Sequence, residues 1–522
     1  MNVGALNRRT GAQLVLLAWA VALGWLARRE LGKDEAETIT EATVRLSPEA
    51  HFYSVSASNR QIGYASVTID TLATGFALSE VLALDVPEAD SIRRVTRRTE
   101  LVLSRSLRLR SFSRTVTGSG LFEEFTGRVE GDTVLHMGQR DSRDRPPAEW
   151  VVPVPGDVVL PQVLPYRLAF GKRLEVGRSV SVNVLDLTTG TIGRVAFAAT
   201  AESTFVIADS AVEQRQTHRW RPVTYDTVRA WRIEHSASGT PMVTWVDAQG
   251  GLVRTEAALG VRLERSAFEL VSFNYRSALE RAGPDGHREV PAMATIVGSK
   301  AVLAPTTEAA DSRTYQIASE PVERFLVPRV AWLAGGRQTA SGDQVVIGAR
   351  GASRGDSAKS DYLEPSPSLR PVAATVAAEA ARLASTMTAD PIATVRILAR
   401  WIATQIKVDG RQDAPRMAEH VLESRRAGAE GKAALMVDFA RSLDLPARTV
   451  GGVALVAGRA VGHAWAEVRI DGVWVAVDPT FGQVPASPRL IRVGVGISGQ
   501  AIDLVPLLGS ARITPVEPMV QR

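Results

Sequence analysis

The sequence predicts a multidomain chain with one N-terminal transmembrane helix, a large antiparallel β-domain and a C-terminal α+β domain. Three features predict this architecture: an apolar run near the N-terminus, a long region of short strand-like segments, and helical periodicity after a polar linker. We place the anchor at residues 1–34, the β-rich domain at 35–295, a short β segment and linker at 296–361, the α+β domain at 362–500 and a C-terminal tail at 501–522.

The composition excludes several classes of protein. The chain has 522 residues, of which 45% are hydrophobic and 22% charged, so it is neither mostly disordered nor a polytopic membrane protein. Lys and Arg number 61 against 56 Asp and Glu, and the small net charge of +5 does not favour nucleic acid as a partner. The chain has no cysteine, which excludes disulfides, cysteine-ligated metals and a cysteine nucleophile. The sequence shows no cofactor or metal motif, so we expect neither.

The first element is a membrane anchor. Residues 10–27 carry no charge. As a helix they reach about 27 Å, close to the roughly 30 Å hydrocarbon core of a bilayer. Arginine pairs at both ends can reach the two interfaces. A cleaved signal peptide is the alternative, because Ala22–Gly24 resembles a cleavage site. We favour the anchor, because apolar residues continue through Trp25 to Ala27.

The anchor sets the expected location of the rest of the chain. Positive charges on the two sides of the span are nearly equal, so they do not decide its orientation. A short N-terminal tail is more simply kept inside the cell while the long C-terminal part is exported. No second long apolar run follows in the sequence. We therefore expect a single-pass inner-membrane protein that contacts membrane lipid through residues 10–27 and has the bulk of its chain in the periplasm.

The middle of the chain predicts one large antiparallel sheet. Segments rich in β-branched and aromatic residues alternate with turns between about residues 45 and 280. Strand-like segments include 60–70, 75–78, 107–110, 179–184, 194–197, 228–233, 241–246 and 252–255. Many short strands joined by turns are typical of a sheet that is curved or closed.

A basic run lies within this region. From Arg93 to Arg114 there are eight arginines and one acid, Glu100. Because side chains alternate along a strand, Arg108, Arg110 and Arg114 are expected to share one face. We favour the simpler interpretation, a solvated strand face, over a surface that binds lipid headgroups or an acidic partner protein.

The C-terminal domain begins with helices and continues with hairpin strands. The segment 371–387 is alanine-rich with helical spacing, and Asp390 followed by Pro391 is a helix start. A further helix is expected from about Glu430 to Leu443. Strand-like segments 449–450, 453–456, 461–470 and 473–477 follow. Helices followed by hairpin strands indicate an α+β domain.

Three motifs in this domain carry a family resemblance. They are Leu443-Asp-Leu-Pro-Ala-Arg448, His463-Ala-Trp-Ala-Glu467 and Gly472-Val-Trp-Val-Ala-Val-Asp-Pro-Thr480. In order and spacing they resemble the transglutaminase-like superfamily, which shares the papain-like core, over about residues 362–495. The resemblance implies a Cys-His-Asp triad in which the cysteine attacks an acyl carbon, the histidine moves the proton and the aspartate orients the histidine. His463 and Asp478 match the last two positions. The β-rich region is loosely similar to the domain that often precedes such domains in exported bacterial proteins.

The cysteine position does not match the family. The family pattern is Gly-Asp-Cys-x-Glu at the start of a helix, and ungapped alignment places Ala427–Gly431 there, with Ala429 at the nucleophile position. An engineered Cys-to-Ala change, a relocated nucleophile such as Ser424 or Asp438, and natural loss of catalysis are the three explanations. We favour natural loss, because the Asp and Glu that flank the cysteine in the family are also replaced here, both by glycine.

These features predict a function through contacts rather than catalysis. Ala429, His463 and Asp478 are interpreted as vestigial triad positions, so no catalytic residue is expected. We expect a membrane-anchored, exported, non-enzymatic scaffold or accessory subunit of a larger bacterial inner-membrane complex (respiratory, photosynthetic or secretory), with the protein subunits of that complex as partners. The alternatives are a cell-envelope acyl-transferase or cysteine-peptidase-type enzyme, altered from Cys to Ala, and a peptide-binding module that uses the inactive cleft.

Overall fold

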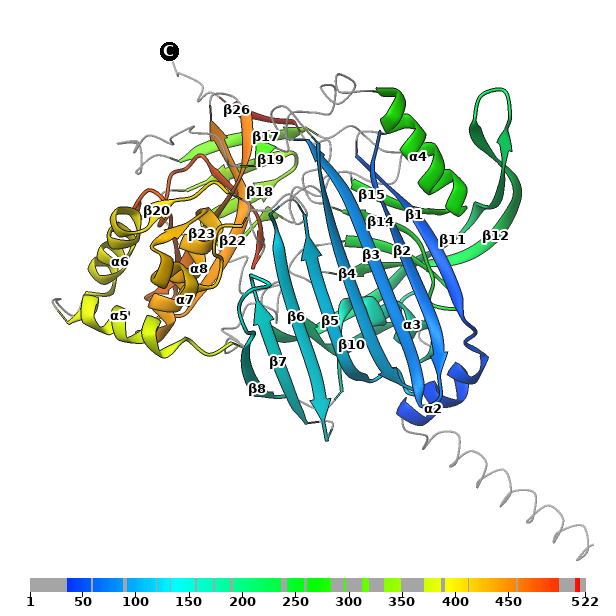
Figure 1. Cartoon of the computed structure of the whole chain (residues 1–522), viewed down its shortest axis with the longest axis horizontal. Coiled ribbons are helices and arrows are strands. Elements are labelled where there is room, and N and C mark those ends of the chain that lie inside the picture. The colour runs from blue at the N-terminus through cyan, green and yellow to red at the C-terminus, as the bar shows by residue number, and fades with distance from the viewer. Residues whose placement is uncertain are drawn as a thin grey trace, which may run out of the picture.

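A computed structural model gives the fold of the chain (Figure 1). It describes residues 35–57, 60–87, 92–118, 120–131, 133–154, 157–171, 174–187, 191–235, 242–257, 261–282, 295–296, 312–318, 333–348, 370–385, 390–411, 413–456, 459–496 and 512–516. The predicted membrane anchor, residues 10–27, lies outside these ranges. Within them, no helix is long and apolar enough to cross a membrane.

Fifteen strands within the described residues form one large sheet (Figure 1). Its order is β8-β7-β6-β5-β4-β3-β2-β1-β15-β14-β13-β12-β11-β10-β9, and neighbours are antiparallel except for the parallel pair β9 and β10. The strands are β1 (Glu49–Ala57), β2 (Arg60–Leu72), β3 (Gly75–Pro87), β4 (Ile92–Ser104), β5 (Leu109–Thr117), β6 (Phe122–Glu130), β7 (Val134–Arg140), β8 (Ala148–Pro153), β9 (Val158–Val159), β10 (Ser179–Asp186), β11 (Thr191–Gln214), β12 (Arg219–His235), β13 (Met242–Asp247), β14 (Leu252–Ala257) and β15 (Val261–Ser266). The prediction of a large antiparallel β-domain is confirmed.

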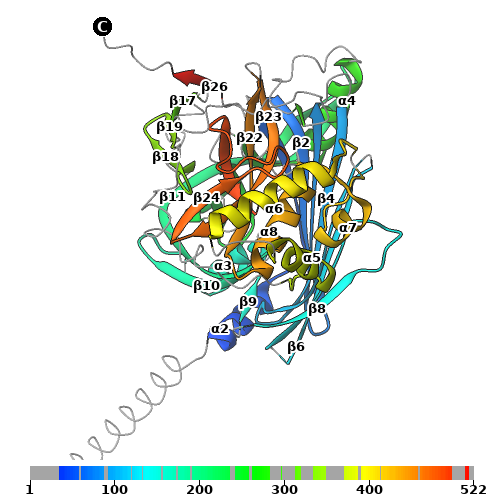
Figure 2. The same cartoon turned by 90° about the vertical axis from the view of Figure 1, so that its left-hand side faces the viewer.

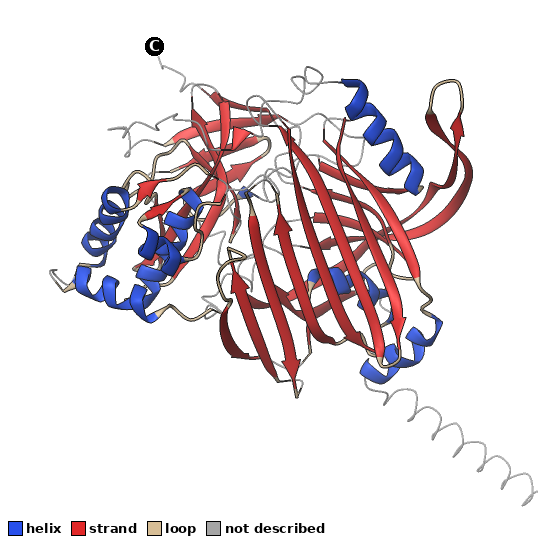
Figure 3. Ribbon diagram, viewed as in Figure 1, coloured by secondary structure: helices blue, strands red, loops and turns tan. Residues whose placement is uncertain are grey.

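The inner face of this sheet holds the main hydrophobic core. Along β5, Phe112 and Val116 are buried whereas Ser113 and Thr115 are partly exposed, which is the alternation expected of a half-buried strand. Phe112 shares a core cluster with Leu164 and other residues of a short helix, α3, which lies against the sheet (Figure 1). The helical segments of this region are α2 (Glu35–Ala42), η1 (Thr43–Arg45), η2 (Pro161–Val163), α3 (Leu164–Phe170) and α4 (Phe268–Ala282). Figure 3 shows how little helix this part of the chain contains.

The basic run does not form the single exposed face that the sequence predicts. Arg110 is exposed, Arg108 is half-buried with its Nε 4.0 Å from Asp157 Oδ1, and Arg114 is only 8% exposed. Arg114 lies on the buried face of β5, and its guanidinium carbon lies 5.9 Å from the ring centroid of Phe125. The expectation of a shared exposed face is wrong for Arg114, because the register between β4 and β5 shifts at Arg110 and breaks the alternation between Arg110 and Arg114.

The C-terminal domain places helices beside a small sheet (Figure 2). The helices are α5 (Ala374–Ala384), α6 (Pro391–Gln405), α7 (Ala418–Ser424) and α8 (Ala429–Ser442), and the strands of the sheet are β16 (Thr295–Ile296), β22 (Ala447–Val456), β23 (Arg459–Ile470), β24 (Val473–Val477) and β25 (Leu490–Val495). A separate parallel pair joins β20 (Lys407–Val408) to β21 (Arg426–Ala427). Asp390 caps α6 as predicted, because its Oδ1 accepts a 3.0 Å hydrogen bond from the N–H of Ile392. The helix expected near Glu430 is α8.

The segments expected as a linker region and a tail both contribute strands beside this domain. A four-stranded sheet has the order β18-β19-β17-β26, with β17 (Arg313–Ala318), β18 (Gln338–Ser341) and β19 (Gln344–Ile347) from the segment 296–361 and β26 (Arg512–Val516) from the segment 501–522. Tyr315 and Ile317 of β17 pack with Val453 and Ile491 of the domain's own sheet. The strands around the domain are therefore held together by apolar packing across a long stretch of sequence.

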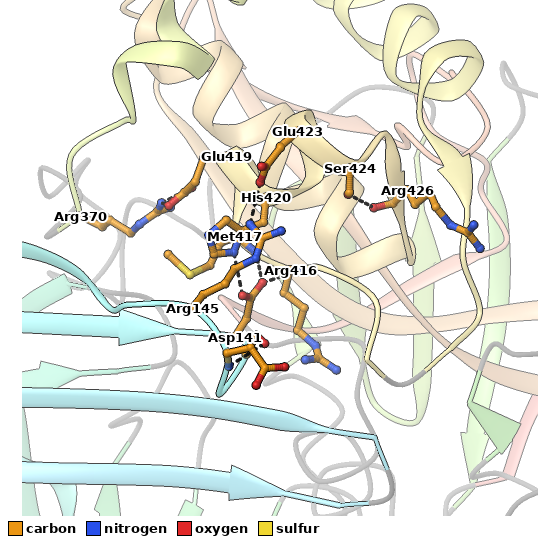
Figure 4. Close-up of polar contacts among 12 residues, drawn as sticks. Asp141, Arg145, Arg370, Arg416, Met417, Glu419, His420, Glu423, Ser424 and Arg426 are labelled. Carbon is orange, nitrogen blue, oxygen red and sulfur yellow. Dashed lines mark hydrogen bonds and ion pairs between the residues drawn. The ribbon is translucent and has the colours of Figure 1, made fainter.

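A polar contact joins the β-domain to the C-terminal domain, where the turn after β7 meets the start of α7 (Figure 4). Asp141 Oδ2 accepts hydrogen bonds from the backbone N–H groups of Arg416 (2.9 Å) and Met417 (3.1 Å). Asp141 Oδ1 lies 2.7 Å from Nδ1 of His420. Burial by itself would raise the pKa of Asp141, but the hydrogen bonds from His420 and the two N–H groups lower it to about 2.

Replacing Asp141 by asparagine is expected to weaken this contact. The free energy of unfolding should fall by about 2 kcal/mol at pH 7, since charge-assisted hydrogen bonds contribute more than neutral ones. The folded pKa of Asp141 lies below the ordinary value of 3.8, so its contribution is present above about pH 4 and is lost as the pH falls toward 2. Urea denaturation of the wild type and the variant, each at pH 7 and pH 3, measures this difference.

The exposed Asp144 in the same turn offers a matched control. Asp144→Asn should change the free energy of unfolding by less than about 0.5 kcal/mol at either pH. An Asp141→Asn effect of the same size at pH 3 as at pH 7 would show that the carboxylate charge does not carry the contact.

Candidate functional site

The β23–β24 hairpin brings His463 and Asp478 together. The two strands are joined by a turn at Asp471 and Gly472, which both have positive φ, and the register pairs Ala466 with Val477. Asp478 follows directly after β24, so it lies beside the middle of β23, near His463. His463 Nε2 lies 2.9 Å from Asp478 Oδ2, and the two side chains are 2% and 0% exposed.

The histidine is oriented as a proton carrier would be. Asp478 Oδ2 contacts its Nε2, which leaves Nδ1 as the ring nitrogen available to a second group. Asp478 is itself held by the backbone N–H of Thr480, which donates to Oδ1 at 2.9 Å. The rings of Trp465 and Phe481 lie 6.3 Å and 6.0 Å from the imidazole, centroid to centroid. The pair is therefore rigidly held and shielded from water.

Ala429, the residue that the motif alignment assigns to the nucleophile position, lies at the start of α8. Gly428 is the N-cap of this helix and Ala429 is its first residue, as the alignment of the motif predicts. Helix α8 packs against β23 and β22, the strands that carry the histidine and its neighbours. The side chain of Ala429 is a methyl group with no electron pair, so a thiolate-type attack cannot start from it.

The close packing of the backbone around Gly431 is a second difference from the family pattern at the start of α8. A Cβ at this position would lie 2.3 Å from the carbonyl oxygen of Pro415 and 3.0 Å from both Ala427 Cβ and Val421 Cγ2. The family pattern has a glutamate here, and no side chain fits without movement of the neighbouring backbone. The glycine is thus required by the present structure.

The sequence motifs do not point to Lys432, which the structure places at the same site. This lysine is the fourth residue of α8, its side chain is fully buried, and its Nζ has no hydrogen-bond partner among the described residues. Burial lowers the pKa of Lys432 to about 8, although the negative charge of Asp478 opposes that shift. One feature of the sequence does indicate that this lysine is buried. Lys432 lies at helical spacing from Leu435 and Phe439, on the apolar face of α8.

A second buried polar group lies on the same face of β23 as His463, four residues further along the strand. Glu467 is 2% exposed, and its Oε2 accepts hydrogen bonds from Nε and Nη2 of Arg448 at 2.8 Å and 2.7 Å. The Arg448 guanidinium also lies 3.9 Å from the ring centroid of Trp474. Arg337 donates to the carbonyl oxygens of two residues in the loop before β25, and burial lowers its pKa to about 10. These contacts give a structural role to Glu467 of the second sequence motif and to Trp474 of the third.

The C-terminal domain combines helices with a small sheet, and its hairpin carries a buried His–Asp pair and packs against α8. Residues 378–479 match the family model of the transglutaminase-like superfamily, so this part of the chain is a transglutaminase-like domain. The predicted resemblance is therefore confirmed. No curated protein matches the chain.

Part of the chain is also similar to a solved structure. It is a candidate cysteine protease from Cytophaga hutchinsonii, with 19% sequence identity and a TM-score of 0.21. The match covers 27% of the present chain and 48% of that protein, so the chain spans about half of its length.

Proposed function

We propose that this protein is a non-enzymatic, membrane-anchored scaffold or accessory subunit of a bacterial inner-membrane complex. The observation that carries the proposal is the start of α8, where Ala429 occupies the nucleophile position and Gly431 leaves no room for the acid that follows it in the family. The chain also contains no cysteine that could act from elsewhere. The His463–Asp478 pair then stabilises the hairpin, and the domain serves as a rigid folded unit.

The anchor and the charge distribution support a role near a membrane. An uncharged stretch at residues 10–27 would confine the folded part to a layer close to the bilayer, which raises its effective concentration toward membrane partners. A weak interface would then suffice for association. Within the basic run, Arg110 is an exposed member that could contribute to such an interface.

Replacing His463 by alanine tests the proposal. Amine incorporation into a glutamine peptide and hydrolysis of peptide substrates should both stay at background for the wild type, and His463→Ala should leave that background unchanged. Pull-down of the full-length chain from native membranes in mild detergent should recover the same partner subunits with both proteins, because contacts rather than the pair carry the function.

Two outcomes contradict the proposal, and they do so in different ways. Turnover that is lost in His463→Ala would show an enzyme that uses another nucleophile. Loss of the partner subunits in a folded His463→Ala variant would show that the old cleft binds the partner, which is the peptide-binding alternative.

A further inference from the structure

The first turn of α8 favours a negative charge, and the N-cap residue of the helix supplies none. The first N–H groups of a helix have no acceptor within the helix, and the helix dipole favours negative charge there. The family fills this place with a cysteine thiolate. Here the N-cap is Gly428 and the next residue is Ala429, and neither side chain can supply a negative charge. Glu430 in the same turn carries one, but its carboxylate lies 3.4 Å from Nε of Arg416.

Lys432 is a second and independent sign of a missing anion at this turn. Side chains of an α-helix lean toward its N-terminus, so the lysine stem runs back alongside the first turn. Its side chain is 0% exposed, and no described residue forms a hydrogen bond with Nζ. A buried polar group without a partner is costly, and native proteins satisfy nearly all such groups with a protein atom, water or ligand.

The surrounding acids are already engaged. Asp478 is bonded to His463 through one carboxylate oxygen and to the N–H of Thr480 through the other. The Thr480 hydroxyl beside it is buried and has no partner among the described residues. The ammonium group of Lys432 and the hydroxyl group of Thr480 are therefore both buried without a hydrogen-bond partner in the described part of the chain.

We propose that the first turn of α8 and Lys432 together bind a monovalent carboxylate, which takes the place of the family's cysteine thiolate. This inference goes beyond the scaffold role and does not depend on it. Lys432 carries a single positive charge, which the nearby carboxylate of Asp478 already offsets in part, so a monoanion is favoured over a dianion such as phosphate. Ala429 is only half-buried, so the rest of the fold does not fully cover the first turn.

The bound carboxylate can come from two sources: a small free carboxylate or the C-terminus of a partner chain. Acetate is the probe for the first and N-acetylalanine for the second, with N-acetylalanine amide as the uncharged counterpart of the latter. The melting temperature of the full-length chain in mild detergent at pH 7 should rise with acetate concentration, because a ligand that binds only the folded state stabilises it. A further rise with N-acetylalanine, absent with its amide, would identify a chain terminus as the better ligand.

Variants of two lysines separate specific binding from a general salt effect. Lys432→Met should abolish the rise in melting temperature, whereas Lys407→Met, which removes an exposed lysine on β20, should keep it. An equal rise in all three proteins, or no rise in any of them, would overturn the proposal.

Position 429 supplies a further test that leaves Lys432 in place. Ala429→Asp provides an internal carboxylate at the first turn and should remove the response to acetate, whereas the neutral Ala429→Asn should retain it. In the wild type, NMR titration of the Lys432 side chain should show its pKa rising when acetate is added, since a bound anion favours the ammonium form. A full acetate response in Ala429→Asp, or an unchanged lysine pKa, would also overturn the proposal.

Discussion

Replacing Lys432 by methionine is expected to raise the free energy of unfolding at pH 7 by up to about 3 kcal/mol, measured in buffer free of carboxylates. The ammonium group is fully buried without a hydrogen-bond partner among the described residues, and methionine fills a similar volume without a charge. Burial is the larger effect on this lysine and the attraction of Asp478 the smaller one, so removal of the charge is favourable overall.

The pH dependence of this difference follows from the lowered pKa. The amine has a pKa of about 8 in the folded chain and about 10.5 when unfolded. Between these values the unfolded chain binds more protons, so the wild type becomes more stable as the pH rises from about 8 to about 10.5. Lys432→Met lacks this gain. Its advantage should therefore be largest below pH 8 and shrink at higher pH.

Urea denaturation at pH 7 and at pH 9.5 measures both effects. Lys407→Met is the matched control, because that lysine is exposed on β20 and its removal should change the free energy of unfolding by less than about 0.5 kcal/mol. A Lys432→Met variant less stable than the wild type at pH 7 would mean that the ammonium group makes strong compensating interactions in the folded chain.

Replacing Gly431 by alanine is expected to lower the free energy of unfolding by about 3 kcal/mol. The added methyl group would lie 2.3 Å from the carbonyl oxygen of Pro415, a backbone atom that cannot rotate away. The higher helix propensity of alanine offsets at most about 1 kcal/mol of this cost. Overpacking therefore dominates, and differential scanning calorimetry should show a clear fall in melting temperature.

Gly428 provides the control in the same turn of chain. A Cβ there would meet only the carbonyl oxygen of Asp409, at 3.4 Å, and the backbone φ of −74° is open to any residue. Gly428→Ala should therefore cost only about 0.5–1 kcal/mol, the difference between glycine and alanine at an N-cap. Equal effects of the two substitutions would contradict the close packing around Gly431 and, with it, the argument that the family's acid no longer fits.

Much of the fold follows from local patterns that can be read in the chain. Alternating segments predict the antiparallel sheet, and Asp390 followed by Pro391 predicts the start of α6, because propensity and capping act over a few residues. The motif around His463 predicts the bond to Asp478, since hairpin register brings the two positions together. Helix α7 was not predicted, because it is only seven residues long and shows no strong period.

The sequence by itself determined the identity of the site: a transglutaminase-like domain with a histidine and an aspartate in place and no sulfur to activate. These are facts of residue type and order along a short stretch of chain. The tertiary structure alone decided which groups are buried, and therefore which charges affect the free energy of unfolding. Arg114 lies on the covered face of its strand, and Asp141 binds α7 across 275 residues of chain. Lys432 is buried where α8 packs on the sheet, and its ammonium group has no hydrogen-bond partner among the residues that the structure describes. Burial depends on segments far apart in the sequence, and local periodicity carries no information about what packs against a given face.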